Sequence, residues 1–256
     1  MTKREETIYK MHGISVSNGK LVSPIGLINP VLKQGNTKVG KNVWTFSTLP
    51  TNKLFQTEFG IVSGTCPCTC KGGYCQSGHY HRGSVIRSMA INTILAYKHL
   101  DWLKMAIIAQ LETLRPCYVR IHATGDFFSD DYATMWEDIV VYDYDCTFWT
   151  YTKVAKFESI FDKYPNANIV KSILPGGKFN YGHCEDILHA KAMLESIGEE
   201  VHICPCGVDD SQHCENCTGC SASKWVLFIE HSTDYVAKAD PFYASVVEAI
   251  SNQPRR

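Results

Sequence analysis

The sequence lacks the features of a membrane or exported protein. No stretch approaches the about 18 consecutive apolar residues that a membrane helix needs. The first residues, MTKREETIYKMHG, are charged and have no apolar core of the kind found in a signal peptide. We therefore expect a cytoplasmic protein without a membrane partner.

The chain also lacks an excess of charge of either sign. Lys and Arg number 25, Asp and Glu number 26, and the formal net charge is -1. Without an overall positive field, electrostatics does not recruit nucleic acid to the chain. A local basic patch would still allow binding, so nucleic acid is an open but not a favoured partner.

Residues 1–57 lack any sustained hydrophobic period, because glycine or proline interrupts them every few residues. We expect them to form an irregular N-terminal wrap. The remaining residues, 58–256, are expected to form a single domain. With 256 residues in total, of which 45% are hydrophobic, the chain can bury a full core.

Beyond residue 57, short apolar segments alternate with amphipathic ones. The predicted strands span residues 117–125, 146–152, 167–174, 200–205 and 225–230, and the predicted helices span residues 84–113, 130–141, 155–164, 185–197 and 241–250. This alternation predicts an α/β fold with parallel β/α repeats, in the form of a partial or complete β/α barrel. A flat doubly wound sheet is the alternative.

Cysteine is abundant, with twelve residues in the chain. Thiols stay reduced in a protein that is not exported, so metal ligation is favoured over disulfides. Four cysteines lie within residues 66–75 and five within residues 204–220, whereas Cys117, Cys146 and Cys184 stand alone and are expected to be packing residues. The first group follows a predicted strand that ends near Ser63, and the second begins in the predicted strand over residues 200–205, which would place these cysteine-rich loops at one face of the fold.

The second group has the spacing of an iron–sulfur site. Cys214, Cys217 and Cys220 form a C-x2-C-x2-C run, and Cys204, followed by proline, supplies a fourth thiolate. Bacterial ferredoxins use this arrangement around a [4Fe-4S] cluster. Structural zinc is the alternative, and a histidine at position 202 or 213 would replace one thiolate.

The first group leaves more alternatives open. Cys66, Cys68, Cys70 and Cys75 lie within ten residues, on a loop with two glycines. Four thiolates would close a second [4Fe-4S] cluster, and three would leave one iron open to a ligand. Zinc, or one cluster shared between the two groups, is the other interpretation. The sequence therefore predicts one or two clusters.

The motifs resemble the "gene product eighty-eight" family of phages and mobile elements, iron–sulfur proteins of unassigned function. The resemblance covers residues 58–220. It is carried by a Thr-Cys-Pro step at 65–67, Gly-Asp-Phe at 125–127, Phe-Trp-x-Tyr-Thr at 148–152, and Cys-Pro at 204–205 with the later C-x2-C-x2-C run. The chain differs by the order Tyr74-Cys75 and by the additional Cys68. The resemblance implies a phage-encoded protein of the host cytoplasm.

A weaker resemblance is to radical S-adenosylmethionine enzymes, which begin with a strand, a three-cysteine loop and a helix in a partial β/α barrel. Thr124, Gly125 and Asp126 occupy the place of that family's glycine-rich motif near the methionine moiety. The resemblance implies S-adenosylmethionine as a cosubstrate bound by these three residues. The cysteine spacing is C-x3-C-x4-C here and C-x3-C-x2-C in that family.

Polar residues at strand ends are further candidates, with Asp126 and Lys153 as the predicted catalytic pair. The structural alternative for Asp126 is to cap the helix near residue 130, for which Ser129 is better placed. Lysines 153 and 171 would hold an anionic ligand or be solvated. Further candidates are His122, Tyr151 and His183.

Two functions follow from these residues. The first is a redox or radical enzyme that acts on a small-molecule ligand or takes electrons from a donor. The second is a non-enzymatic protein whose fold is stapled by iron–sulfur clusters or zinc and which binds nucleic acid or a host partner.

Overall fold

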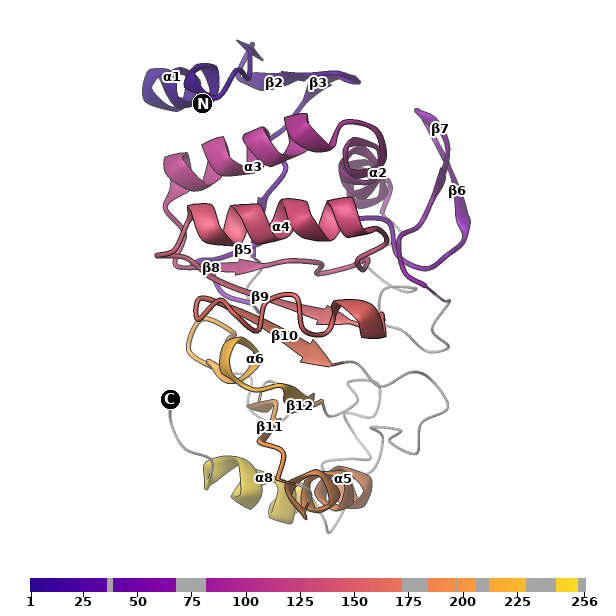
Figure 1. The fold of residues 1–256 in the computed structure, drawn as a ribbon, viewed down its shortest axis with the longest axis vertical. Helices are drawn as coiled ribbons and strands as arrows, with labels where there is room; N and C mark the ends of the chain where they lie inside the picture. Colours follow the sequence, from indigo (N-terminus) through magenta and orange to yellow (C-terminus); the bar gives the residue numbers. More distant parts are fainter. Residues whose placement is uncertain are drawn as a thin grey trace.

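The main sheet of the protein has five strands in the order β10-β9-β8-β5-β4 (Figure 1). The computed structural model of the 256-residue chain describes residues 1–35, 39–67, 82–171, 184–196, 198–205, 212–228 and 243–252. The strand bounds are β4 (Lys33–Gln34), β5 (Val43–Thr45), β8 (Tyr118–Arg120), β9 (Thr147–Thr152) and β10 (Ala167–Lys171). The pairs β10-β9, β9-β8 and β8-β5 are parallel, and the edge strand β4 is antiparallel to β5.

The centre of this sheet is formed by residues with high strand propensity. Strand β9 reads TFWTYT, consists of aromatic and β-branched residues only, and buries four of its six side chains. Phe148 lies in register with Val119 on one side and with Ala167 on the other. Burial on both faces explains why the strand lacks a polar-out alternation.

Helices α2 (Gly83–Lys98), α3 (Leu100–Leu114) and α4 (Asp130–Tyr142) pack beside the sheet and against one another (Figure 1). Ser129 begins α4 as its N-cap, because its hydroxyl accepts a hydrogen bond from the Tyr132 backbone N–H at 3.2 Å. Trp136 of α4 meets Phe46 edge-on at 5.2 Å, and both are fully buried. These aromatic contacts join the helices to the sheet.

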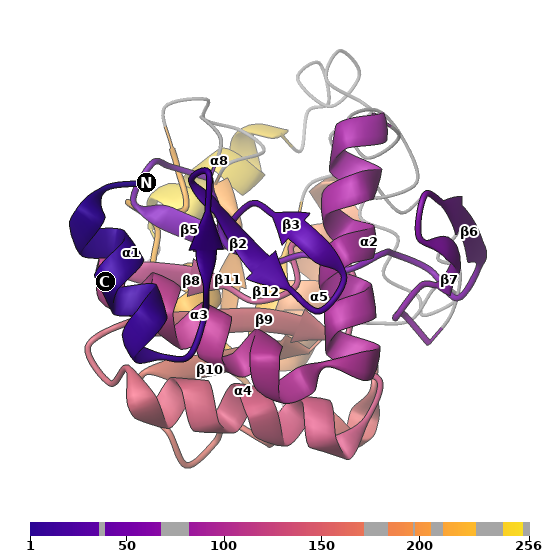
Figure 2. The ribbon, with the colours of Figure 1, turned by 90° about the horizontal axis from the view of Figure 1, so that it is seen from above.

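The N-terminal elements pack on the outside of these helices (Figure 2). Helix α1 (Lys3–Met11) begins with a capping box between Thr2 and Glu5 and contacts α3. It precedes a three-stranded antiparallel sheet of β1 (Val16–Ser17), β2 (Lys20–Ser23) and β3 (Gly26–Ile28). A separate hairpin of β6 (Leu54–Thr57) and β7 (Gly60–Ser63) leads towards Cys66.

The C-terminal elements lie beyond β10 and have a small core of their own (Figure 1). They comprise α5 (Cys184–Ser196), β11 (Val201–Ile203), α6 (Gly219–Ala222), β12 (Trp225–Leu227) and α8 (Tyr243–Ser251), whereas the short helix η3 (Ala155–Phe157) lies between β9 and β10 in the chain and packs in the main core through Phe157. Strands β11 and β12 pair in parallel as a two-stranded sheet. Helix α6 contacts β9, β10, β11 and β12, so it joins this region to the main sheet.

The prediction of a parallel β/α barrel was wrong. The described strands form an open five-stranded sheet and three smaller sheets, two of which are wholly antiparallel. The sheet does not continue as a barrel because β4 ends one edge in antiparallel orientation and β11 pairs with β12 instead of β10. The division of the chain at residue 57 stays a prediction.

Two predicted helices also differ from the structure. The helix expected over residues 84–113 is two helices, because the chain leaves helical geometry at His99, where φ is -142°. Only a 3-10 turn, Ala155–Phe157, forms at the start of the helix expected over residues 155–164. Within the described part of the chain, no helix is both long enough and apolar enough to span a membrane.

Candidate functional site

Four cysteines come together at the junction between the main sheet and the C-terminal elements. We call Cys204, Cys214, Cys217 and Cys220 the C-terminal cysteine set; all four are half-buried free thiols. Cys204 directly follows β11, where its backbone N–H donates to the carbonyl oxygen of Leu227 at 2.7 Å. The other three lie on the segment that leads into α6 or within it. The set therefore draws its cysteines from two elements, and its role as a ligand set stays a prediction.

Cys220 has the most defined surroundings of the set. The hydroxyl of Tyr151, on β9, donates a hydrogen bond to the Cys220 sulfur at 2.9 Å. The Arg120 guanidinium lies over the Tyr151 ring, 5.0 Å from its centroid. Burial raises the pKa of Cys220 to about 12, the Tyr151 hydrogen bond opposes this increase, and charge on the Cys214 thiol adds to it. The thiols therefore interact electrostatically.

Cys217 lies beside an imidazole. Its sulfur is 3.4 Å from Nε2 of His202, which is on β11. Gly219 permits this approach, because a Cβ there would lie 2.1 Å from the His202 ring. Nδ1 of His213 is buried and has no hydrogen-bond partner among the described residues. The region therefore holds nitrogen donors as well as sulfur donors.

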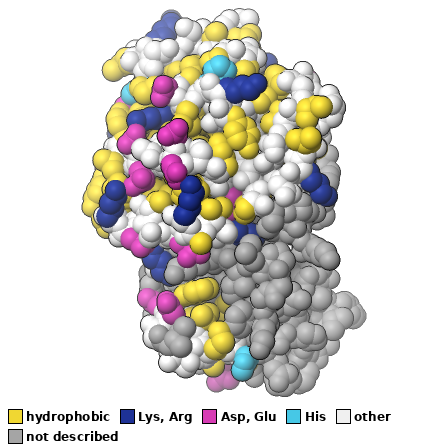
Figure 3. Space-filling model, turned by 45° about the vertical axis from the view of Figure 1, so that its right-hand side comes forward, with side chains coloured by type: hydrophobic (Ala, Val, Ile, Leu, Met, Phe, Trp, Pro, Cys, Tyr) yellow, Lys and Arg dark blue, Asp and Glu magenta, His cyan; other side chains and the backbone are white. Residues whose placement is uncertain are grey.

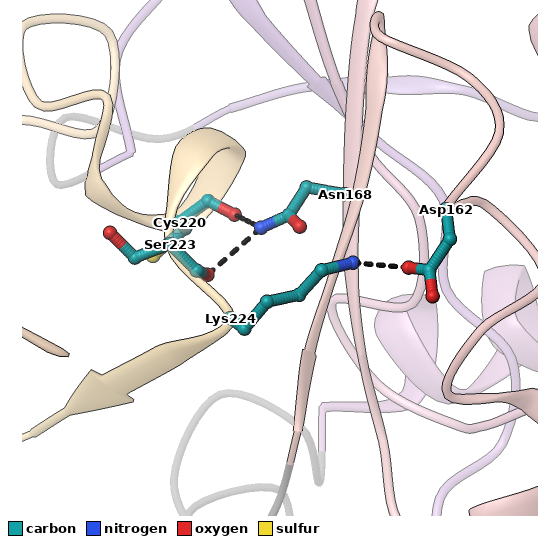
Figure 4. Close-up of polar contacts among 5 residues, drawn as sticks. All are labelled: Asp162, Asn168, Cys220, Ser223 and Lys224. Carbon is teal, nitrogen blue, oxygen red and sulfur yellow. Dashed lines mark hydrogen bonds and ion pairs between the residues drawn. The ribbon is translucent and has the colours of Figure 1, made fainter. Parts of the chain in front are cut away.

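The segment that carries Cys220 is attached to β10 by side chains (Figure 4). Nδ2 of Asn168 donates to the carbonyl oxygens of Cys220 and Ser223, both at 2.9 Å. Lys224 forms an ion pair with Asp162 at 2.5 Å on the exposed side of the same junction. Asn168 is 5% exposed, so its two hydrogen bonds are shielded from water.

The donor types in this region fit a sulfur-ligated metal group. Reduced thiols with a nearby imidazole are ligands for iron–sulfur clusters and for zinc. Among the residues that the structure describes, however, no group of three or more His, Cys, Asp or Glu side chains is close enough to hold a metal ion. The set is gathered but is not in ligating geometry.

The first cysteine group is described only at its start. Cys66 follows Thr65, and its backbone N–H donates to the carbonyl oxygen of Thr51 at 3.1 Å. Cys68, Cys70 and Cys75 lie outside the described residues. The ligand set of this group and its cluster therefore stay predictions.

Asp126 is 2% exposed and is bonded to the fold through both carboxylate oxygens. Oδ1 accepts hydrogen bonds from the Phe127 backbone N–H at 2.8 Å and from the Thr152 hydroxyl at 2.7 Å. Oδ2 accepts a hydrogen bond from the Lys153 backbone N–H at 2.9 Å. Burial raises the pKa of Asp126, and these three hydrogen bonds oppose the increase. The carboxylate joins the end of β9 to the loop after β8.

Threonine hydroxyls fill the space next to this carboxylate. The Asp126 backbone N–H donates to the Thr65 hydroxyl at 3.1 Å, which lies 2.8 Å from the Thr48 hydroxyl. The Thr124 hydroxyl donates to the carbonyl oxygen of Thr48 at 2.7 Å. Gly125 has a φ of 92°, and a Cβ there would lie 1.8 Å from the Thr48 hydroxyl oxygen. The packing brings the predicted Thr-Gly-Asp segment next to the residue before Cys66.

The other predicted site residues are distributed differently. His122 is buried, with Nε2 2.8 Å from the Tyr132 hydroxyl and Nδ1 3.3 Å from the Thr150 hydroxyl. Burial lowers the pKa of His122 to about 3, so the imidazole is neutral. The side chain of Lys171 and the whole of His183 lie outside the described residues. A catalytic role for Asp126 and Lys153 stays a prediction.

Sequence reasoning missed Arg120 and Asn168. Both are polar residues in short strands, YVR and ANIVK, and each adjoins a fully buried residue, Val119 and Ile169 respectively. A polar side chain in a buried strand needs a hydrogen-bond or charge partner. The presence of Arg and Asn in these strands could therefore have marked both residues as candidates. The partners themselves, the Tyr151 ring and the α6 segment, could not be identified without the fold.

Searches of curated proteins and of solved structures each found no match. The family model described as Gene product 88 matches residues 30–226. This match confirms the resemblance to the phage family and extends it towards the N-terminus. It does not test the weaker resemblance to radical S-adenosylmethionine enzymes. Because the match covers most of the sequence, the chain belongs to the Gene product 88 family.

Proposed function

We propose that this chain is an iron–sulfur protein in which Cys204, Cys214, Cys217 and Cys220 hold a [4Fe-4S] cluster for redox chemistry. The observation that carries the proposal is the position of two cysteine segments at the sheet junction, with the half-buried Cys220 sulfur accepting a hydrogen bond from Tyr151. Hydrogen bonds to ligand sulfurs are characteristic of iron–sulfur sites.

The chain's own residues support this role in two ways. Asn168 fixes the backbone at Cys220 and Ser223, which holds the C-x2-C-x2-C segment against β10. Tyr151 and the nearby Arg120 provide a hydrogen-bond donor and a positive charge beside the sulfur. When bound, the cluster would supply one-electron transfer, and these residues would orient it and exclude water.

A second cluster at the first cysteine group, with an iron open to a small ligand, is the enzymatic version of this proposal. Its support is the position of Thr65 beside Asp126, which brings the start of this group next to the predicted catalytic carboxylate. The use of S-adenosylmethionine has less support. The space around Gly125 is filled by Thr48 and Thr65, and Asp126 is bonded to the fold.

Zinc is the second candidate, and one contact favours it. His202 lies 3.4 Å from the Cys217 sulfur, and His213 adds a buried nitrogen without a described partner. A mixed set of thiolates and imidazole is typical of structural zinc. A zinc site would link β11 to α6 and would support no redox chemistry.

A non-enzymatic role in binding nucleic acid or a host partner has weaker support. Figure 3 shows acidic and basic side chains interspersed on the described part of one face, without a patch of one sign there. Nucleic-acid binding depends on clustered positive charge. A salt-dependent gel shift would detect such binding, because phosphate contacts weaken as salt increases.

The test is metal and sulfide analysis of protein purified without oxygen. We expect a brown protein with iron and acid-labile sulfide in equal amounts. Cys217→Ala should lose this iron, whereas Cys117→Ala, which changes an exposed isolated cysteine, should retain it. A colourless protein with stoichiometric zinc would establish the zinc alternative. Cys66→Ala tests the second cluster, and its presence predicts loss of about half of the iron.

A further inference from the structure

The Tyr151 side chain reaches the C-terminal cysteine set from the main sheet. It extends from β9, and its hydroxyl donates to the Cys220 sulfur at 2.9 Å. This hydroxyl donates to Cys220, whereas the ring nitrogen of His202 lies 3.4 Å from a different sulfur of the set, that of Cys217. A phenol ordinarily keeps its proton up to a pH of about 10, so this hydroxyl is available as a donor at neutral pH.

The Tyr151 ring is held in place from several elements. The Arg120 guanidinium, on β8, lies 5.0 Å from the ring centroid. The Phe228 ring, directly after β12, meets the Tyr151 ring edge-on at 5.8 Å. Because the ring is already fixed, its hydroxyl can form the hydrogen bond to the sulfur without a further loss of side-chain entropy. The nearby cation also makes the hydroxyl proton more positive and its hydrogen bond stronger.

A donor in this position acts differently on the two oxidation states of a cluster. Adding one electron increases the negative charge on the ligand sulfurs, and a hydrogen bond stabilises the more negative state. The reduction potential therefore increases when a donor is present and decreases when it is removed. No bond between heavy atoms forms or breaks in this change.

We infer that Tyr151, supported by Arg120, sets the reduction potential of the cluster by hydrogen bonding to the Cys220 ligand. This inference rests on the proposed function, because it needs a cluster at the C-terminal cysteine set. The inference goes beyond the proposed function because it assigns control of the reduction potential to a residue of the main sheet that is not a ligand of the cluster. Tyr151 is thus a tuning residue.

The experiment is a redox titration of Tyr151→Phe under anaerobic conditions, with dithionite as reductant and electron paramagnetic resonance as readout. Phe keeps the ring and removes the hydroxyl. We expect unchanged iron content and a more negative midpoint potential, such that the reduced-to-oxidised ratio at a fixed potential falls about tenfold, or about 59 mV for one electron. Tyr118→Phe on neighbouring β8 is the matched control and should leave the potential unchanged.

The outcomes separate the two proposals. Wild-type protein without iron and sulfide would overturn the proposed function and this inference together. Full iron content with an unchanged potential in Tyr151→Phe would overturn only the inference. If Tyr151→Phe loses its iron, Phe228→Leu decides, because it loosens the Tyr151 ring while keeping both the hydroxyl and the Arg120 charge. A smaller negative shift of the potential in Phe228→Leu supports the inference, and an unchanged potential overturns it.

Discussion

The side-chain amide of Asn168 donates a hydrogen bond to the backbone carbonyl oxygen of Cys220 at 2.9 Å, although 52 residues separate the two in sequence. A second bond from the same amide nitrogen reaches Ser223. The position of the last cysteine in the C-x2-C-x2-C run therefore depends on strand β10. The main sheet and the candidate metal site are structurally coupled.

Asn168→Ala should weaken this coupling. A buried carbonyl oxygen at Ser223 and a partly buried one at Cys220 lose their donor, which costs about 1–3 kcal/mol in the free energy of unfolding. We also expect faster loss of metal to a chelator, measured by the visible absorbance of the protein over time. Lys224→Ala is the matched control from the same junction, because it removes only an exposed ion pair. Equal rates of metal loss in the two variants would contradict the role of Asn168.

Asp126→Asn should destabilise the fold. Both carboxylate oxygens of Asp126 accept hydrogen bonds, so the amide nitrogen of Asn would face a donor in either orientation. The expected loss is about 1–3 kcal/mol, measured by urea unfolding. Asp131→Asn, which changes an exposed carboxylate nearby on α4, should stay within about 0.5 kcal/mol of wild type. Wild-type stability in Asp126→Asn would show that the three hydrogen bonds do not hold the loop.

Gly125→Ala should be more destabilising than Gly26→Ala. Both glycines have positive φ, 92° and 111°, so both substitutions carry backbone strain. A Cβ at Gly125 would also collide with Thr48, whereas a Cβ at Gly26 meets no atom within 4 Å. We expect a difference of about 1–3 kcal/mol between the two variants in urea unfolding. Equal losses would mean that only the backbone conformation matters at Gly125.

The burial of the His122 imidazole should make the stability of the fold depend on pH. Its pKa decreases from 6.5 to about 3 in the folded protein because of burial, so below pH 6.5 the unfolded chain binds a proton that the folded chain does not. The free energy of unfolding should therefore fall as the pH decreases from 6.5 towards 3. His122→Asn removes this titration, and Asn tolerates the φ of 56°.

The measurement is urea unfolding of wild type and His122→Asn at several pH values below 6.5. Wild type should lose more stability than the variant over this range. Parallel profiles for the two proteins would contradict a buried neutral imidazole at position 122. Because other groups titrate in both proteins, the difference between the profiles reports on His122.

Local signals in the sequence predicted several elements well. Ser129 caps α4, and the patterns around β9 and β10 gave strands at the expected positions. These elements have strong periodicity or a capping residue, so neighbouring residues determine them. The barrel prediction failed because sheet order depends on long-range pairing. Strands β4 and β5 are only two and three residues long, and their pairing next to β8 leaves no periodic signal.

The candidate site could be predicted in its ligand types but not in its surroundings. Cysteine spacing identifies Cys214, Cys217 and Cys220 as one group without reference to the fold. The Tyr151 contact joins residues 69 positions apart, and the Asn168 contact depends on where α6 packs. Such partners follow from tertiary packing, which short-range patterns do not encode.

The decisive measurement is native mass spectrometry of anaerobically purified wild-type protein and of Cys220→Ala. If Cys204, Cys214, Cys217 and Cys220 hold a [4Fe-4S] cluster, wild type carries an added mass equal to four iron and four sulfide atoms. Cys220→Ala then loses this mass, or one such unit if two clusters are bound. Wild-type protein that carries only zinc or no added mass, or a Cys220→Ala variant with the full wild-type increment, would contradict it.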